Sequence, residues 1–251
     1  MLSFVTCIKL CAGYETYVDR LRLYVECIVA GCAYEYEIVV VLEVGANAAL
    51  EEEFGRASFL QHVVLLNYVP TYPNPHGYNM IEAFAKNVGI RAARFPFVCV
   101  TNCDILFSDS FFNLRFKPAT FYRFLTYETA PVDDWSLTLT AAKALFAEAT
   151  PVNPELIQAK TLNNVGHKSG DIMLMDKATW LKVGGFPEND VWVYSDLVVC
   201  VVVSNNGVPL EVPDASIYTY PQKHQTGHVF EHNRSLEYLR LTTTNPHLTN
   251  N

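Results

Sequence analysis

The chain has 251 residues, of which 50% are hydrophobic, and its mean hydropathy is +0.11. A chain of this length can bury about three quarters of the surface that its unfolded form exposes, which excludes a disordered protein and favours one large domain. The net charge of −8 and the isoelectric point near 5.3 argue against nucleic acid or an anionic membrane as the main partner, because both require a basic face.

Strands and helices alternate over the first hundred residues. Apolar runs rich in β-branched and aromatic residues predict strands buried on both faces, at residues 2–8, 37–43, 62–69 and 95–102. Segments with apolar residues at helical spacing predict the intervening helices, at residues 17–30, 47–55 and 79–94. This alternation is typical of parallel βαβ units, so an open, Rossmann-like α/β sheet is expected. Neither GxGxxG after the first strand nor GxxxxGK[ST] anywhere is present, so the usual dinucleotide and P-loop motifs are missing.

The second half of the chain has a different pattern. Residues 121–127 and 171–176 are predicted strands, and the polar, Pro-containing stretch from about 130 to 169 is interpreted as a specificity loop. The valines of residues 191–207 favour a strand, but Ser195 and Asp196 can start a helix that Asn-Asn-Gly ends, and a helix is predicted. No repeat and no linker composition occurs, so a single domain is expected.

The cysteines and the apolar runs bear on where the protein works. Seven cysteines fall mostly inside apolar segments without a CxxC pair, which is typical of buried thiols in a reducing compartment. The chain starts without a basic segment, and no apolar run approaches the roughly 20 residues that span a bilayer. A cytoplasmic protein without a membrane span is expected.

The predicted strand at 95–102 continues directly into Asn102, Cys103 and Asp104, with Asp109 close behind. Ligands of open α/β sheets bind beyond the carboxyl ends of the strands, so Asn102 and Asp104 are expected at a binding site. Strand alternation predicts that both side chains point to the same side. Oxygen ligands of this kind suit Mg²⁺ or Mn²⁺, while a simple turn that Asp104 and Asp109 stabilise is an equally weighted alternative.

Three segments together resemble the GT-A glycosyltransferases, close to the family-two type: "AFAKNVGIRAARFPFVCVTNCDILFSD", "SGDIMLMDKATWLKVGGFPEND" and "YSDLVV". The first is similar to that family's N-x-G-x-x-x-A helix and D-x-D strand end, and the second to its acceptor-side W-x-x-x-G-G-F/Y-x-E stretch. The resemblance implies a GT-A domain with a mainly parallel central sheet and helices on both faces. Residues 1–104 would bind a nucleotide sugar and residues 105–251 an acceptor. Asn102 departs from the family's pattern, because it replaces the first Asp of D-x-D.

The resemblance also implies a reaction. A sugar would move from a nucleoside-diphosphate sugar to a hydroxyl of a glycan or other small acceptor, with inversion of configuration and with Mn²⁺ or Mg²⁺ as cofactor. A departing diphosphate must be neutralised by a cation or by basic side chains. Two other functions stay open: a nucleotide-sugar-binding module that has lost turnover, which Asn102 suggests, and a nucleotide-sugar pyrophosphorylase, whose Gly-rich signature is missing here.

On the donor side, Lys86 and Arg91 are candidates for neutralising the phosphates, with a solvated helix face as the alternative for each. The family's pattern places Thr6 near the base and directs Glu43 toward the nucleoside. It also places Asn87 and Gly89 at the nucleotide, and Asp104, supported by Asn102, at the metal.

Asp196 matches the position of the family's catalytic base, with Glu188 as the fallback. Asp171 is a candidate contact of the donor sugar or the acceptor, and Trp180 is an acceptor-side candidate for which a place in the core is the favoured alternative. The resemblance further implies a metal ligand near the C-terminus, for which His224 and then His228 are the candidates beside Asp104.

Overall fold

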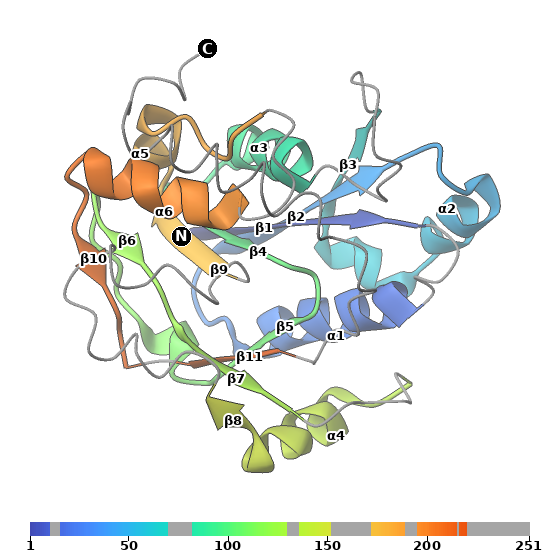
Figure 1. The fold of residues 1–251 in the computed structure, drawn as a ribbon. Helices are drawn as coiled ribbons and strands as arrows, with labels where there is room; N and C mark the ends of the chain where they lie inside the picture. Colours follow the sequence, from blue (N-terminus) through green and yellow to red (C-terminus); the bar gives the residue numbers. More distant parts are fainter. Residues whose placement is uncertain are drawn as a thin grey trace, which may run out of the picture.

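The computed structural model describes residues 1–10, 16–69, 82–129, 136–151, 172–188, 195–214 and 216–219 (Figure 1). The strands are β1 Leu2–Lys9, β2 Tyr36–Glu43, β3 Val64–Tyr68, β4 Phe97–Thr101, β5 Ile105–Phe107, β6 Phe121–Tyr122, β7 Leu125–Glu128, β8 Thr150–Pro151, β9 Ile172–Asp176, β10 Leu210–Glu211 and β11 Ser216–Thr219. The α-helices are α1 Thr16–Gly31, α2 Ala48–Phe54, α3 Glu82–Ala92, α4 Leu139–Ala144, α5 Lys177–Lys182 and α6 Ser195–Asn205. Short 3-10 helices are η1 Ser58–His62, η2 Phe111–Asn113 and η3 Leu145–Glu148.

The main sheet has the strand order β10-β6-β9-β4-β1-β2-β3. β1 lies parallel to β2 and β4, β2 lies parallel to β3, and β9 is antiparallel to β4 and β6. α1 packs on one face of this sheet and α3 on the other, so β1 and β2 are buried almost throughout (Figure 1). The predicted mainly parallel α/β sheet with helices on both faces is confirmed, and the helix predicted at 191–207 is α6.

A second sheet, with the order β5-β11-β7-β8, was not predicted. Its strands are two to four residues long, which is too short for an alternating pattern to stand out. The single strand predicted at 121–127 is wrong, because the chain divides there between β6 of the main sheet and β7 of the second sheet. β5 directly follows the β4 turn and pairs antiparallel with β11, so the second sheet continues from the end of β4.

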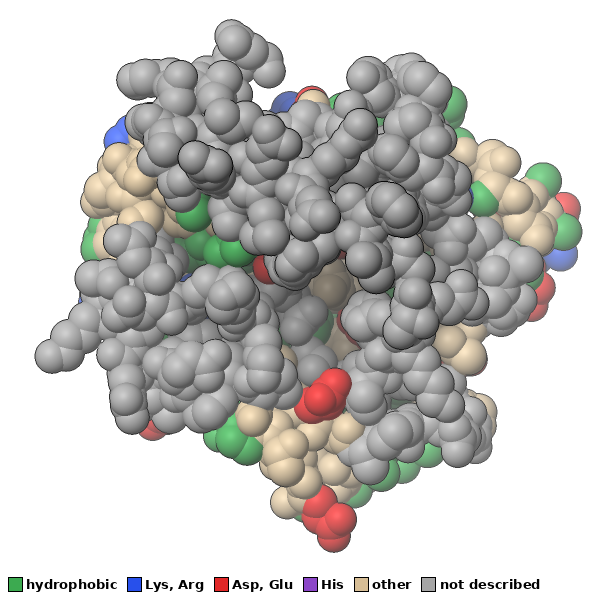
Figure 2. Space-filling view, in the orientation of Figure 1, with side chains coloured by type: hydrophobic (Ala, Val, Ile, Leu, Met, Phe, Trp, Pro, Cys, Tyr) green, Lys and Arg blue, Asp and Glu red, His purple; other side chains and the backbone are tan. Residues whose placement is uncertain are grey.

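The exposed acidic side chains and the character of the helices are consistent with the acidic, mixed composition of the chain. Figure 2 shows acidic side chains at the edge that α2 forms, where Glu52 and Glu53 are exposed. Among the residues that the structure describes, none of the helices has the length and apolar character needed to cross a membrane.

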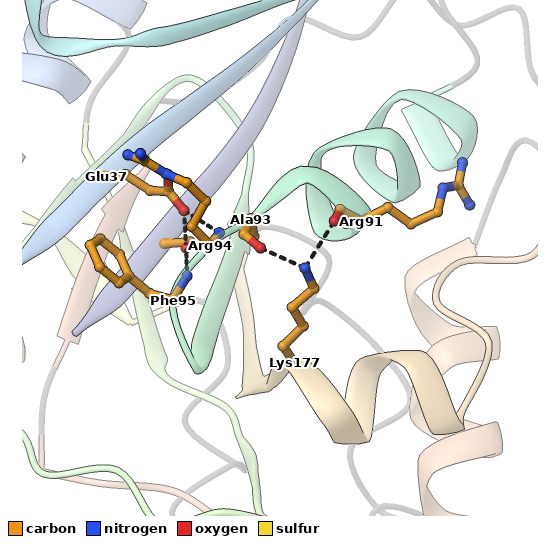
Figure 3. Close-up of polar contacts among 7 residues, drawn as sticks. Glu37, Arg91, Ala93, Arg94, Phe95 and Lys177 are labelled. Carbon is orange, nitrogen blue, oxygen red and sulfur yellow. Dashed lines mark hydrogen bonds and ion pairs between the residues drawn. The ribbon is translucent and has the colours of Figure 1, made fainter.

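Polar contacts fix the start of β4 at the amino edge of the sheet (Figure 3). Lys177 Nζ donates to the carbonyl oxygens of Arg91 and Ala93, at 2.9 and 2.6 Å, and so satisfies carbonyls at the end of α3. Glu37, near the start of β2, accepts from the backbone nitrogen and Nε of Arg94. These contacts fix the first residues of β4, and the candidate site lies at the other end of this strand.

Glu37 gives the fold a predicted pH dependence. Burial by itself raises the pKa of this carboxyl, but hydrogen bonds from Ser3 and Arg94 outweigh it and lower the pKa below its usual value. A carboxyl with a lowered pKa in the folded state adds stability above its unfolded pKa of about 4.3, and this is lost as the pH falls through the folded value.

We therefore expect Glu37→Gln to reduce the free energy of unfolding by about 1–3 kcal/mol at neutral pH and by less in acid. Urea denaturation at about pH 7 and at about pH 3.5, on either side of the unfolded pKa, measures the difference. Glu35→Gln is the matched control, because Glu35 is an exposed glutamate two positions away. Equal losses for Glu37→Gln at both pH values would contradict the assignment.

Candidate functional site

The carboxyl ends of β1 and β2 carry a partly buried charge pair. Lys9 and Glu43 are register partners, and Lys9 Nζ donates to Glu43 Oε1 at 2.8 Å. Glu43 is 4% exposed, and its Oε2 has no hydrogen-bond partner among the described residues. Thr6 Oγ1, on β1, is likewise buried without a partner in the described part of the chain. Because unpaired buried oxygens are costly, both are suited to accept a ligand's hydroxyl or amide hydrogen.

The end of β4 places Asn102 and Asp104 toward opposite faces of the sheet. Asn102 Oδ1 accepts a hydrogen bond from Lys86 Nζ of α3 at 2.9 Å. Asp104 Oδ2 lies 3.5 Å from Nη1 of Arg20, on α1, which packs on the other face. The predicted same-side arrangement is wrong, because β4 ends at Thr101 and the following turn no longer alternates as a strand does.

Lys86 is a buried cation at this strand end. Its exposed fraction is 4%, so the solvated-face alternative does not hold for it. Nζ also donates to Glu82 Oε2 at 3.0 Å and lies 5.5 Å from the centre of the Phe186 ring. Burial alone lowers the pKa of Lys86, but the charge of Glu82, with contributions from Cys7 and Asp196, raises it. Lys86 therefore stays charged, and Asp196 lies near enough to influence it.

Asn87 joins α3 to the segment that follows α5. Its Oδ1 accepts from the backbone nitrogen of Phe186, and its Nδ2 donates to the Phe186 carbonyl oxygen, both at 2.8 Å. Nδ2 also donates to Glu188 Oε1 at 2.9 Å, and Arg91 Nη1 donates to the same oxygen at 3.0 Å. These bonds position Glu188, while nucleotide contacts of Asn87 and Arg91 stay a prediction.

Two of the sequence-predicted residues have packing roles. A Cβ on Gly89 would lie 2.3 Å from Val5 Cγ1, so this glycine allows α3 to approach β1 closely, while its contact with a nucleotide stays a prediction. Trp180 is 0% exposed, and its Nε1 donates to the carbonyl oxygen of Val98 at 3.0 Å. The expectation that an acceptor sugar stacks on Trp180 is corrected, because no face of the ring is open; its core alternative holds.

The remaining candidates divide between described and undescribed residues. Asp196 is half-buried and lies in the first turn of α6. Asp171, His224 and His228 lie outside the described residues. Within the described part of the chain, no group of three or more His, Cys, Asp and Glu side chains could hold a metal ion. Asp104 fits a divalent ion of the kind that binds through one carboxylate plus substrate phosphates.

Sequence reasoning did not identify Arg20. Charged residues at helical spacing give the same pattern whether they face solvent or a distant strand end, so no local signal marks this one. A buried partner such as Asp104 becomes visible only in three dimensions.

Comparison with known proteins gives a fold and no sequence relative. No protein-family model matches the chain, and no curated protein matches its sequence. Among solved structures, S. aureus TarS 1–349 in complex with UDP-GlcNAc matches at a TM-score of 0.59 and 12% identity, over 100% of this chain and 67% of that one. TarS 1–349 without that ligand matches at 0.58 and 11%, and this chain spans 65% of its length.

Two further structures match as well. Mannosyltransferase PcManGT from Pyrobaculum calidifontis, in complex with GDP-Man and Mn²⁺, has a TM-score of 0.57 and 14% identity, over 97% of this chain and 64% of that one. GalNAc-T7 with UDP, GalNAc and Mn²⁺ has a TM-score of 0.57 and 11% identity, over 88% of this chain and 44% of that one. The chain therefore has the GT-A fold of these glycosyltransferases.

Proposed function

We propose that the protein is a glycosyltransferase that moves a sugar from a nucleoside-diphosphate sugar to a hydroxyl of a glycan or other small acceptor, with inversion of configuration. The observation that carries this proposal is the end of β4, where the buried carboxylate Asp104 closely follows Asn102, and Asn102 accepts a hydrogen bond from the buried cation Lys86, with Asp196 near that cation. Its position at a carboxyl strand end of a GT-A fold supports a donor site there.

A divalent ion, Mn²⁺ or Mg²⁺, belongs to the proposal. The Mn²⁺ complexes of PcManGT and GalNAc-T7 support it, and Asp104 is the described residue that would hold the ion, with His224 or His228 as a further ligand. Such an ion, when bound, neutralises the charge of the departing diphosphate.

The chain's own residues divide the remaining tasks. Lys86 places a second positive charge at the phosphates, and Oε2 of Glu43, which has no partner among the described residues, accepts a hydrogen bond from a hydroxyl of the nucleoside. Asp196 takes the proton of the acceptor hydroxyl as the sugar is transferred, with Glu188 as the alternative base. Asp171 is a proposed contact of the acceptor or donor sugar.

The test is calorimetric binding of UDP and GDP to the wild type and to Asp104→Asn, with Mn²⁺ and with a chelator. Wild-type affinity should be higher with Mn²⁺. Asp104→Asn should lose most of that gain, at least about tenfold or about 1.4 kcal/mol, because an amide is a weaker ligand than a carboxylate. Asp109→Asn is the matched control, since Asp109 is 88% exposed and pairs with Lys143. If neither nucleotide binds the wild type, the proposed function is wrong.

Incubation with UDP-GlcNAc and GDP-Man then separates the three functions. A transferase slowly releases the nucleoside diphosphate, because water replaces the missing acceptor. A binding module binds the donor without releasing it. A pyrophosphorylase makes a nucleoside triphosphate once pyrophosphate is added.

A further inference from the structure

A guanidinium lies beside Asp104, and none of the roles above uses it. Arg20 Nη1 is 3.5 Å from Asp104 Oδ2, and the two side chains are 11% and 3% exposed. The guanidinium carbon lies 5.0 Å from the centre of the Tyr17 ring, also on α1. A charge pair this buried is weakly screened, so the positive charge of Arg20 acts strongly on whatever binds at Asp104.

The helix that carries Arg20 is fixed against β4 at a second point. Tyr24 lies one turn further along α1 on the same face, and its hydroxyl is 2.9 Å from Oγ1 of Thr101, the last residue of β4. Tyr24 and Thr101 are both 0% exposed. Arg20 is therefore held on a rigid element, so little of its freedom remains to be lost when a ligand binds.

Arg20 and Lys86 reach the same turn from opposite faces of the sheet. Lys86 comes from α3 and bonds Asn102, while Arg20 comes from α1 and pairs with Asp104. Position 102 is an amide, so Asp104 carries the only negative charge of the turn formed by residues 102–104. Two cations thus contact the turn that carries this one carboxylate, at the place proposed for a diphosphate. Arg is well suited to phosphate, because its planar fork donates two parallel hydrogen bonds.

We propose that Arg20 is a further donor-site residue, whose guanidinium binds the diphosphate and makes part of the donor affinity independent of a divalent ion. This inference rests on the proposed function. A diphosphate at Asp104 draws the guanidinium into charge-assisted hydrogen bonds, and the carboxylate is then left for the ion. Besides the charge of Lys86, binding then has two separable contributions, a metal-independent one from Arg20 and a metal-dependent one through Asp104.

The experiment measures UDP and GDP affinity by calorimetry, in a chelator and in Mn²⁺. Arg20→Gln should lower the metal-free affinity by about tenfold or more, since a charge-assisted bond is lost. The affinity in Mn²⁺ should fall less. The dissociation constant in chelator divided by that in Mn²⁺ should therefore be larger for Arg20→Gln than for the wild type. Arg22→Gln is the matched control, because Arg22 lies on the same helix and pairs with Glu26 at 3.0 Å instead.

A second pair of variants avoids leaving a buried carboxylate unpaired, which can prevent folding. Asp104→Asn should retain metal-free binding, because Arg20 is still present, and Asp104→Asn with Arg20→Gln should lose about tenfold of it. If these two variants have equal metal-free affinity, the role of Arg20 is overturned. It is also overturned if Arg20→Gln lowers the affinity in chelator and the affinity in Mn²⁺ by the same factor, because a merely structural role predicts that result. Wild-type protein that binds neither nucleotide overturns the proposed function as well.

Discussion

Changing Asp196 to Asn should lower the rate of sugar transfer by about a hundredfold or more, while donor affinity stays nearly unchanged. An acceptor hydroxyl is a poor nucleophile at neutral pH and requires a base to take its proton. Asparagine keeps the size and most of the hydrogen bonding of aspartate but cannot act as that base. Asp196 is half-buried in the first turn of α6 and lies near Lys86, which is the cation proposed at the phosphates.

Rates are measured as release of the nucleoside diphosphate from the donor that the wild type hydrolyses, so no acceptor needs to be known. Calorimetry of the same variant with UDP or GDP separates a loss of turnover from a loss of binding. A variant that loses affinity and rate together would place Asp196 in donor binding instead.

Glu188→Gln is the informative comparison. Glu188 Oε1 accepts from both Asn87 and Arg91, so this carboxylate already links α3 to the segment after α5. Glutamine keeps the size and loses an ion pair with a half-exposed partner, which is worth about 0–1 kcal/mol. If Asp196→Asn stays active and Glu188→Gln is inactive, the two roles are exchanged; if both stay active, neither residue is the base.

Local pattern was enough for the main sheet but not for the second one. β1 and β2 are eight-residue strands made mostly of apolar residues and covered on both faces, and such a pattern is visible in the sequence. The β5, β7, β8 and β11 strands are short, and they pair with segments far away in the chain. The chain's change of sheet between β6 and β7 likewise depends on partners and not on the residues themselves.

At the site, the sequence predicted which residues lie at the end of the strand better than it predicted the directions of their side chains. Asn102 and Asp104 do follow a buried strand, but the strand ends one residue before Asn102, so the alternation rule fails where it was applied. Lys86 and Arg20 carry the same charge on helices of similar pattern, and only the structure shows that Lys86 is buried at Asn102 and that Arg20 is largely shielded from solvent at Asp104. A glycine in a helix, such as Gly89, indicates that another group lies close to the backbone, but the sequence does not identify that group.

Gly89→Ala should therefore destabilise the fold, by about 1–3 kcal/mol, even though alanine is the better helix former by about 1 kcal/mol. The added Cβ would lie 2.3 Å from Val5 Cγ1 and 3.3 Å from Val41 Cγ2, so α3 has to move away from the sheet. Val5 is 0% exposed on the central strand β1 and has little room to give way. Urea denaturation measures the loss.

Gly55→Ala is the matched control, with the opposite expected sign. Gly55 has φ −59 and ψ −15, and a Cβ there would meet only backbone oxygens at 3.5 Å. Alanine fits this conformation and restricts the unfolded chain, so stability should rise by about 0.4–1 kcal/mol. Adding Val5→Ala to Gly89→Ala should make the pair less destabilising than the sum of the single changes, because the clash is relieved.

The same change should reach the donor site, because α3 carries both Gly89 and Lys86. A shift of this helix away from β1 lengthens the contact of Lys86 Nζ with Asn102 Oδ1, which is 2.9 Å in the native packing. Gly89→Ala should thus also weaken UDP or GDP binding, and Val5→Ala should restore part of it. If Gly89→Ala is as stable as Gly55→Ala yet binds nucleotide poorly, the glycine serves a close approach of the nucleotide after all.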